Sequence, residues 1–227
     1  MSTSFLIPAP TAVPAAGSAN GWGRLIGASA ALATAEFAQN VDRPVLMLAE
    51  DPRHADQLEA EIRFFAGPDL PVLHFVEWET LPWDSFSPHQ DIISQRLSVL
   101  ATLPNMRNGI VIAAASIVQQ RLPPLDYVAA RSLSLSAGQT LHREEFTDAL
   151  VAAGYYRVPQ VSEHGEFAVR GSLIDIFPMG TNTPVRIDFF DDEIESLRYF
   201  SEDTQLSGDK VDNISVLPAR EVPLDAD

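Results

Sequence analysis

Three continuous apolar runs limit what the chain can fold into, because segments patterned as helices separate them. The runs lie at 43–50, 71–76 and 109–115, and none alternates as a half-exposed strand does. Unbroken runs of this length are typical of strands buried on both faces of a parallel sheet, whose crossover connections are helices. Residues 21–122 are therefore predicted to form one α/β lobe.

Helix signals flank these runs. Apolar groups at helical spacing and many alanines predict a helix over 25–40. A second helix is expected after Asp51 as N-cap, with Pro52 in its first turn. Ser87 followed three residues later by Gln90 forms a capping-box pattern and predicts the start of a third helix, which stops near residue 104.

The character of the chain changes after the proline pair 123–124, because such a pair ends regular structure. A helix is expected over 140–153, and the expected strands are 132–136, 167–177, 185–190, 195–200 and 213–217. These strands predict a small α+β domain whose antiparallel sheet has one face in water. The expected division is an N-terminal arm (1–20), the α/β lobe (21–122), the small domain (123–206) and a return segment (207–227).

Charge and composition restrict the function. The chain has 227 residues, a formal net charge of −16 and a single lysine, Lys210. An acidic field repels nucleic acid, so duplex binding is disfavoured and the expected partner is a protein. The chain has no cysteine, and no apolar run reaches the roughly 20 residues that span a bilayer. No membrane association and a cytoplasmic location are expected.

No pattern of an enzyme site or of a cofactor or metal site is present. The glycine-rich stretch 21–29 resembles a phosphate loop but has Ala28 where the lysine would stand, so we expect no ATP hydrolysis and interpret its glycines as packing at a helix entry. The five histidines show no zinc-ligand spacing. The acidic run 191–193 is interpreted as a hairpin turn. No catalytic, cofactor-binding or metal-binding residue is therefore assigned.

Three aromatic residues within the predicted lobe admit two interpretations. Trp78, Trp83 and Phe86 could stack on nucleic-acid bases, but they stand in an acidic, proline-rich segment. We interpret them as covering an edge of the lobe.

The stretch 163–180, EHGEFAVRGSLIDIFPMG, places an isolated arginine beside a glycine within a strand pattern. Its apolar residues change faces after Gly171, which predicts a bulge or twist there. Arg170 is then either a surface arginine paired with Glu166 or Asp188, or part of a recognition fork with Arg186 on a neighbouring strand. Periodicity leaves both possibilities open.

Three ordered segments carry a resemblance to a known family: 81–97, 163–180 and 184–198. Together they resemble the N-terminal region of the bacterial transcription-repair coupling factor family, Mfd, which is itself similar to the repair protein UvrB. The resemblance implies a helicase-like, degenerate RecA-like lobe with a parallel sheet (21–122, domain 1a). It also implies an inserted UvrA-binding domain (123–206, domain 2) and a return segment that starts domain 1b (207–227).

The resemblance also assigns roles to residues. It implies that Arg170, Arg186 and Phe190 contact UvrA, in a chain that is a non-catalytic adaptor for transcription-coupled nucleotide excision repair. RNA polymerase, DNA and an ATP-driven translocase motor would belong to regions C-terminal to these residues. A cryptic nucleotide-binding or damaged-DNA-binding lobe is the alternative.

Overall fold

The structure is a computed structural model that describes residues 13–19, 21–81 and 84–222. The chain divides into two compact units. The first unit takes in Met1–Glu77 and Asn105–Gln120, and the second takes in Trp78–Pro104 and Arg121–Asp227. Among the described helices, none has the length and apolar character needed to cross a membrane.

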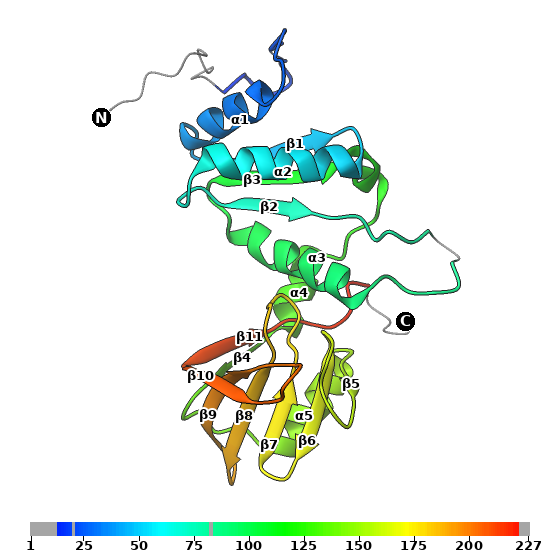
Figure 1. Ribbon diagram of the computed structural model, residues 1–227, viewed down its shortest axis with the longest axis vertical. Helices are drawn as coiled ribbons and strands as arrows, with labels where there is room; N and C mark the ends of the chain where they lie inside the picture. Colours follow the sequence, from blue (N-terminus) through cyan, green and yellow to red (C-terminus); the bar gives the residue numbers. More distant parts are fainter. Residues whose placement is uncertain (1–12, 20, 82–83, 223–227) are drawn as a thin grey trace. The chain divides into compact units, whose positions relative to one another are not determined.

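A three-stranded parallel sheet with strand order β1-β3-β2 forms the centre of the first unit (Figure 1). Its elements are α1 (Ser29–Gln39), β1 (Pro44–Ala49), α2 (Pro52–Ala66), β2 (Val72–Phe75), β3 (Gly109–Ala114) and the 3-10 helix η2 (Ala115–Gln119). The mixed α/β character expected from the sequence is confirmed, since this unit has a parallel sheet and the second an antiparallel one.

Burial differs between the strands of this sheet. The central strand β3 is buried at every position, as its apolar run predicts. The same prediction is wrong for β1, where Leu46 and Leu48 are 61% and 51% exposed. β1 is an edge strand, and α1 and α2 pack in one core cluster with Val45 and Met47 on its other face.

Helix starts in the first unit follow local hydrogen bonding. Asp51 caps α2 as predicted, because its Oδ1 accepts a hydrogen bond from the backbone N–H of His54 at 2.8 Å. The helix predicted over 25–40 begins only at Ser29, whose hydroxyl donates to the carbonyl of Ile26. The glycine interpretation is wrong: a Cβ placed on Gly21, Gly23 or Gly27 would meet no atom within 4 Å, so these glycines are not required for packing.

A polar cluster links α2 to β2. Glu59 accepts hydrogen bonds from Arg63 at 2.8 Å and lies 2.8 Å from Nδ1 of His74. Desolvation by burial would raise the pKa of Glu59, but the hydrogen bonds from Arg63 and His74 outweigh it, and the pKa lies below its usual value.

In its described residues, the second unit contains three α-helices and two sheets. The helices are α3 (Gln90–Thr102), α4 (Leu125–Arg131) and α5 (Arg143–Ala152). The strands are β4 (Leu133–Ser136), β5 (Tyr156–Arg157), β6 (Glu166–Arg170), β7 (Leu173–Ile176), β8 (Val185–Phe190), β9 (Glu193–Phe200), β10 (Ser207–Val211) and β11 (Asn213–Val216). The 3-10 helix η1 (Leu103–Asn105) follows α3.

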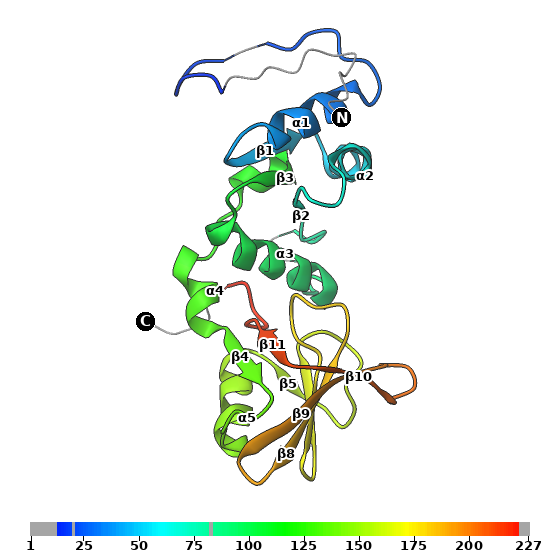
Figure 2. The same ribbon diagram turned by 90° about the vertical axis from the view of Figure 1, so that its left-hand side faces the viewer.

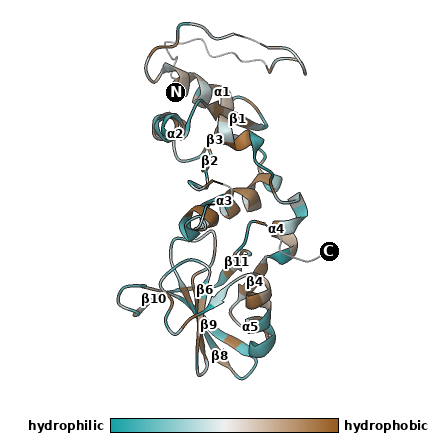
Figure 3. Ribbon diagram, turned by 90° about the vertical axis from the view of Figure 1, so that its right-hand side faces the viewer, coloured by the Kyte–Doolittle hydropathy of each residue, from teal (hydrophilic) through white to brown (hydrophobic). Residues whose placement is uncertain are grey.

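Six of these strands form one sheet in the order β10-β9-β8-β7-β6-β5, and every neighbouring pair is antiparallel except β5 with β6. The inner face of this sheet packs on α5, whose amphipathic residues appear as brown and teal segments in Figure 3. Phe146 and Leu150 of α5 are buried against Phe167 and Ile187 of the sheet in the main core. β4 and β11 pair beside this sheet (Figures 1 and 2).

The prediction of a single strand over 167–177 is wrong, because this range contains two strands. The chain turns at Gly171 and Ser172, so that β6 and β7 form an antiparallel hairpin rather than one bulged strand. Gly171 has φ +62°, a left-handed conformation that favours glycine. The change of apolar face that the sequence shows at Gly171 is thus produced by reversal of the chain.

The predicted cap of one helix is wrong, and one short helix has no counterpart among the predictions. α3 is capped by His89 rather than Ser87, since Nδ1 of His89 accepts from the N–H of Asp91 at 3.3 Å. The short helix α4 directly after the proline pair was not expected, and it buries Tyr127 and Val128 in the core of the second unit.

The division at 122/123 and 206/207 stays a prediction about the family protein. In this structure α3, β10 and β11 all belong to the second unit.

Buried polar contacts join distant segments of the second unit. The Tyr155 hydroxyl donates to the carbonyl of Leu217 at 2.7 Å and accepts from the N–H of Met179 at 3.1 Å. Burial raises the pKa of Tyr155, which keeps the phenol neutral. Arg96, which is fully buried, donates two hydrogen bonds of 2.7 Å to the carboxylate of Glu221.

Candidate functional site

The outer face of the six-stranded sheet carries the candidate site. Side chains two residues apart on a strand share a face, so Arg186, Asp188 and Phe190 of β8 point away from the buried Val185, Ile187 and Phe189. Asp175 of β7 pairs with Arg186, and Ala168 of β6 pairs with Asp175, which places Arg170 on the same face. The structure therefore brings the three predicted residues, Arg170, Arg186 and Phe190, to one face of one sheet.

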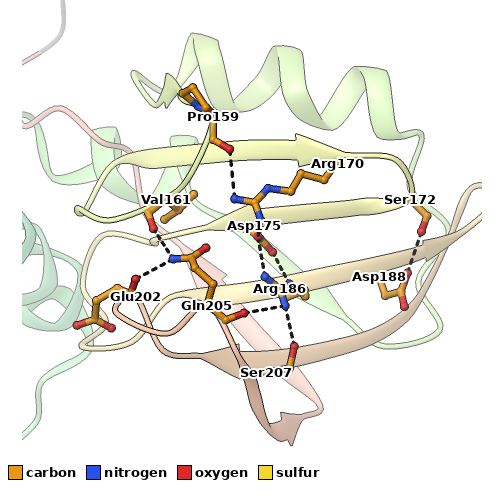
Figure 4. A network of polar contacts seen from close by, with 10 residues as sticks. All are labelled: Pro159, Val161, Arg170, Ser172, Asp175, Arg186, Asp188, Glu202, Gln205 and Ser207. Atoms are coloured by element: carbon orange, nitrogen blue, oxygen red, sulfur yellow. Dashed lines mark hydrogen bonds and ion pairs between the residues drawn. The ribbon is translucent and has the colours of Figure 1, made fainter.

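Asp175 is the centre of this face. Its side chain is 1% exposed, and both of its oxygens accept from Arg186: Nε donates to Oδ1 at 2.7 Å and Nη2 to Oδ2 at 2.9 Å. Two parallel charge-assisted hydrogen bonds of this kind fix the planes of both groups. Figure 4 shows Asp175 between the guanidinium groups of Arg170 and Arg186.

Arg186 also contacts residues other than Asp175. Its Nη1 donates to the Gln205 carbonyl at 3.3 Å and to the Ser207 hydroxyl at 2.9 Å, and its guanidinium carbon lies 5.0 Å from the centre of the Phe200 ring. The hydrogen bond to Asp175 raises the pKa of Arg186, against an opposing effect of burial. With its side chain 16% exposed, Arg186 mainly balances the buried charge of Asp175.

Arg170 is much less constrained. Its side chain is 40% exposed, its Nη1 stands 3.9 Å from Oδ2 of Asp175, and its Nη2 donates to the Pro159 carbonyl at 3.2 Å. The expected pairing with Glu166 or Asp188 is wrong. Glu166 accepts from the N–H groups of residues 162 and 163, and Asp188 accepts from the Ser172 hydroxyl at 3.3 Å. The Arg170 guanidinium is thus aimed by its neighbours but remains open to water.

Phe190 supplies the apolar part of the site. It is 69% exposed at the end of β8, next to the turn at Asp191 and Asp192 that the sequence predicts. An exposed aromatic ring and an exposed guanidinium on one face of a sheet are residue types that often dominate binding energy at protein interfaces.

Sequence reasoning missed Asp175 and the segment that holds Arg186. A lone aspartate within the apolar run LIDIF (173–177), most of which is β7, is the signal that could have drawn attention, because a buried carboxylate requires a cationic partner. Nothing comparable marks Gln205 and Ser207, whose contacts with Arg186 depend on the chain turning back after β9.

The sequence also drew attention to the histidines, the acidic residues and three aromatic residues. No group of three or more His, Cys, Asp or Glu side chains in the described part of the chain could hold a metal ion. His164 lies 2.7 Å from Asp91. Trp78 donates its indole N–H to Glu221 at 3.0 Å, and with the 67% exposed Phe86 it lines a cavity of about 490 Å³. Trp83 lies outside the described residues.

Comparison with known proteins places this sheet in a defined class. Residues 133–222, which include all of its strands, match the UvrB interaction domain family. Over these residues the second unit is therefore similar to UvrB interaction domains.

The chain as a whole is similar to transcription-repair-coupling factors. It is 47% identical over 203 residues to the "Transcription-repair-coupling factor" of Escherichia coli (strain K12), covering 89% of this chain and 18% of that protein. The corresponding protein of Haemophilus influenzae is 43% identical over the same shares, and that of Bacillus subtilis is 28% identical over 87% of this chain and 17% of its own length. These matches confirm the resemblance to the N-terminal region of the transcription-repair-coupling factor family, Mfd. The chain spans less than a fifth of the length of these relatives.

Proposed function

We propose that this chain recruits UvrA through the outer face of its six-stranded sheet, as an adaptor in transcription-coupled nucleotide excision repair. The observation that carries the proposal is the shared exposure of Arg170 and Phe190 on one face of a UvrB interaction domain. In this proposal Arg170 and Phe190 contact UvrA directly. Arg186 contributes mainly by neutralising Asp175 and orienting the face.

The remainder of the chain is assigned a supporting role. We propose that residues 21–122 correspond to a helicase-like lobe that has lost its nucleotide chemistry, because Ala28 stands at the position of the phosphate-loop lysine. The adaptor itself would catalyse no reaction. ATP-driven translocation, contact with RNA polymerase and contact with DNA would belong to other parts of a longer cytoplasmic protein.

The test is a titration of UvrA against the full chain and two single variants. Truncating an interface hot spot costs about 2 kcal/mol or more, so Arg170→Ala and Phe190→Ala should each weaken binding by about thirtyfold or more. Neither variant should unfold the chain, since both side chains are exposed.

Matched controls come from the first unit. Phe64 is 82% exposed on α2, and Arg53 is an exposed arginine on the same helix. Phe64→Ala and Arg53→Ala remove the same two kinds of side chain from the other unit and should leave binding unchanged. If all four variants bind UvrA as the wild type does, the outer face is not the docking site.

A further inference from the structure

A row of cationic side chains crosses the outer face of the sheet beyond the three residues considered so far. Asp175 of β7 pairs with Arg186 of β8, Arg186 pairs with Arg198 of β9, and Arg198 pairs with Lys210 of β10. Directly paired residues of antiparallel strands project to the same face. One buried carboxylate is therefore followed by three cations in consecutive strands.

Only one of these cations is neutralised. Arg186 is paired with Asp175, whereas the Arg198 guanidinium donates to the Gly208 carbonyl at 3.3 Å. Lys210 is exposed. Among the described residues, no carboxylate lies within ion-pair distance of Arg198 or Lys210.

This arrangement costs stability. Like charges directly opposite one another on neighbouring strands repel, and Arg198 has a cation on both sides. The chain has 31 acidic residues against 15 lysines and arginines. With acids in such excess, two neighbouring cations that both lack an acidic partner are unexpected. Features that lower stability locally without a compensating contact are characteristic of functional surfaces.

We propose that Arg198 and Lys210 form a second contact with the docked partner and bind carboxylates on an acidic patch of its surface. The proposal rests on the proposed docking function and extends that site from β6–β8 to β10. A protein is favoured over nucleic acid because the unpaired positive charge is confined to two side chains, while the net charge of −16 repels a polyanion.

The experiment compares two double variants of the full chain in titrations with purified UvrA. Arg198→Gln/Lys210→Gln removes the unpaired cations and keeps long polar side chains. Arg43→Gln/Arg53→Gln removes two exposed arginines of the first unit and is the matched control. Both changes take the net charge from −16 to −18, so a difference between them reports position rather than total charge.

We expect the Arg198/Lys210 variant to bind UvrA about five- to tenfold more weakly than the control at low salt, the size expected for loss of two exposed charge contacts. The difference should narrow as added salt screens those contacts. The variant should be at least as stable as the control to urea, because the repulsion between paired cations is removed. This last result distinguishes a docking role from a structural one.

Three results would overturn the proposal. If Arg170→Ala weakens UvrA binding but the Arg198/Lys210 variant matches its control, only the cationic extension is wrong. If Arg170→Ala and Phe190→Ala both bind UvrA as the wild type does, the docking face itself is wrong and the extension is wrong with it. If the wild type binds duplex DNA and the Arg198/Lys210 variant loses that binding, the partner is nucleic acid.

Discussion

Removal of the Arg186 side chain is the perturbation whose size the structure determines most directly. Arg186 supplies both short hydrogen bonds to a carboxylate that is 1% exposed, and the next cation, Arg170, stands 3.9 Å away. Breaking a buried ion pair by deleting one partner costs about 3–5 kcal/mol, since the other charge stays buried. Arg186 is itself 16% exposed, so we expect Arg186→Ala to cost about 3 kcal/mol, at the lower end of that range.

The assay is urea unfolding of the full chain, with amide hydrogen exchange in β7 and β8 to report on the second unit alone. Arg170→Ala is the control for the same face and should cost no more than about 1 kcal/mol, as expected for a partly exposed pair. The double variant Asp175→Leu/Arg186→Met replaces the pair by apolar groups and should be more stable than Arg186→Ala.

The reasoning would be refuted if Arg186→Ala and Arg170→Ala destabilised the chain equally, or if the apolar double variant were less stable than Arg186→Ala. The stabilities of the Arg186→Ala and Arg170→Ala variants also determine how a loss of UvrA binding in each is explained. A loss of UvrA affinity in Arg186→Ala would arise through a disturbed sheet face, whereas the same loss in Arg170→Ala would arise at a face that is intact.

Three further predictions concern stability. Tyr155→Phe removes the hydroxyl that satisfies two buried backbone groups and should cost about 1–3 kcal/mol in urea unfolding; a neutral effect would mean that those groups find other partners. Arg96→Met should cost about 3–5 kcal/mol, and combining it with Glu221→Leu should recover part of the loss, while strict additivity of the two changes would argue against coupling. Because the pKa of Glu59 is lowered by folding, its contribution is present above the unfolded pKa of about 4.3 and is lost as the pH falls through the folded value. The stability deficit of Glu59→Gln in urea unfolding should therefore shrink as the pH falls from about 5 to 3, and a deficit that grows over this range would contradict this.

Local patterns in the sequence predicted most strands because burial and periodicity are local properties. The Asp51 cap and the acidic hairpin turn after β8 follow from a few consecutive residues, and the parallel lobe follows from the alternation of apolar runs with helix patterns. The exposed face of β1 could not be predicted in this way, because exposure of a strand face depends on which helices pack against it, and α1 and α2 pack on the face that carries Val45 and Met47. The hairpin at Gly171 could not be distinguished from a bulged strand, because a glycine in a strand pattern fits either a bulge or a turn.

At the candidate site, the identities of the three residues could be predicted from the sequence, but their contacts could not. The resemblance supplied Arg170, Arg186 and Phe190, and the strand periods placed the last two on one face. The pairing of Arg186 with Asp175 rather than with a solvent-exposed acid depends on the register of β7 and β8. Cross-strand register is a property of the folded sheet, and for this reason the row that ends at Lys210 was not visible in the sequence.

The order of the strands in the second unit has a consequence for how the proposed site forms. From β6 to β10, each strand pairs with the next one along the chain, so the face is assembled by successive hairpins. Contacts between residues close in sequence close small loops and form quickly, whereas β3 must insert between two strands that precede it. During synthesis the arginine-bearing surface is complete only after residue 211 has emerged, because Arg186 takes one of its acceptors from Ser207 and the row ends in β10. A nascent chain that stops a few residues earlier would carry an incomplete form of the proposed docking face.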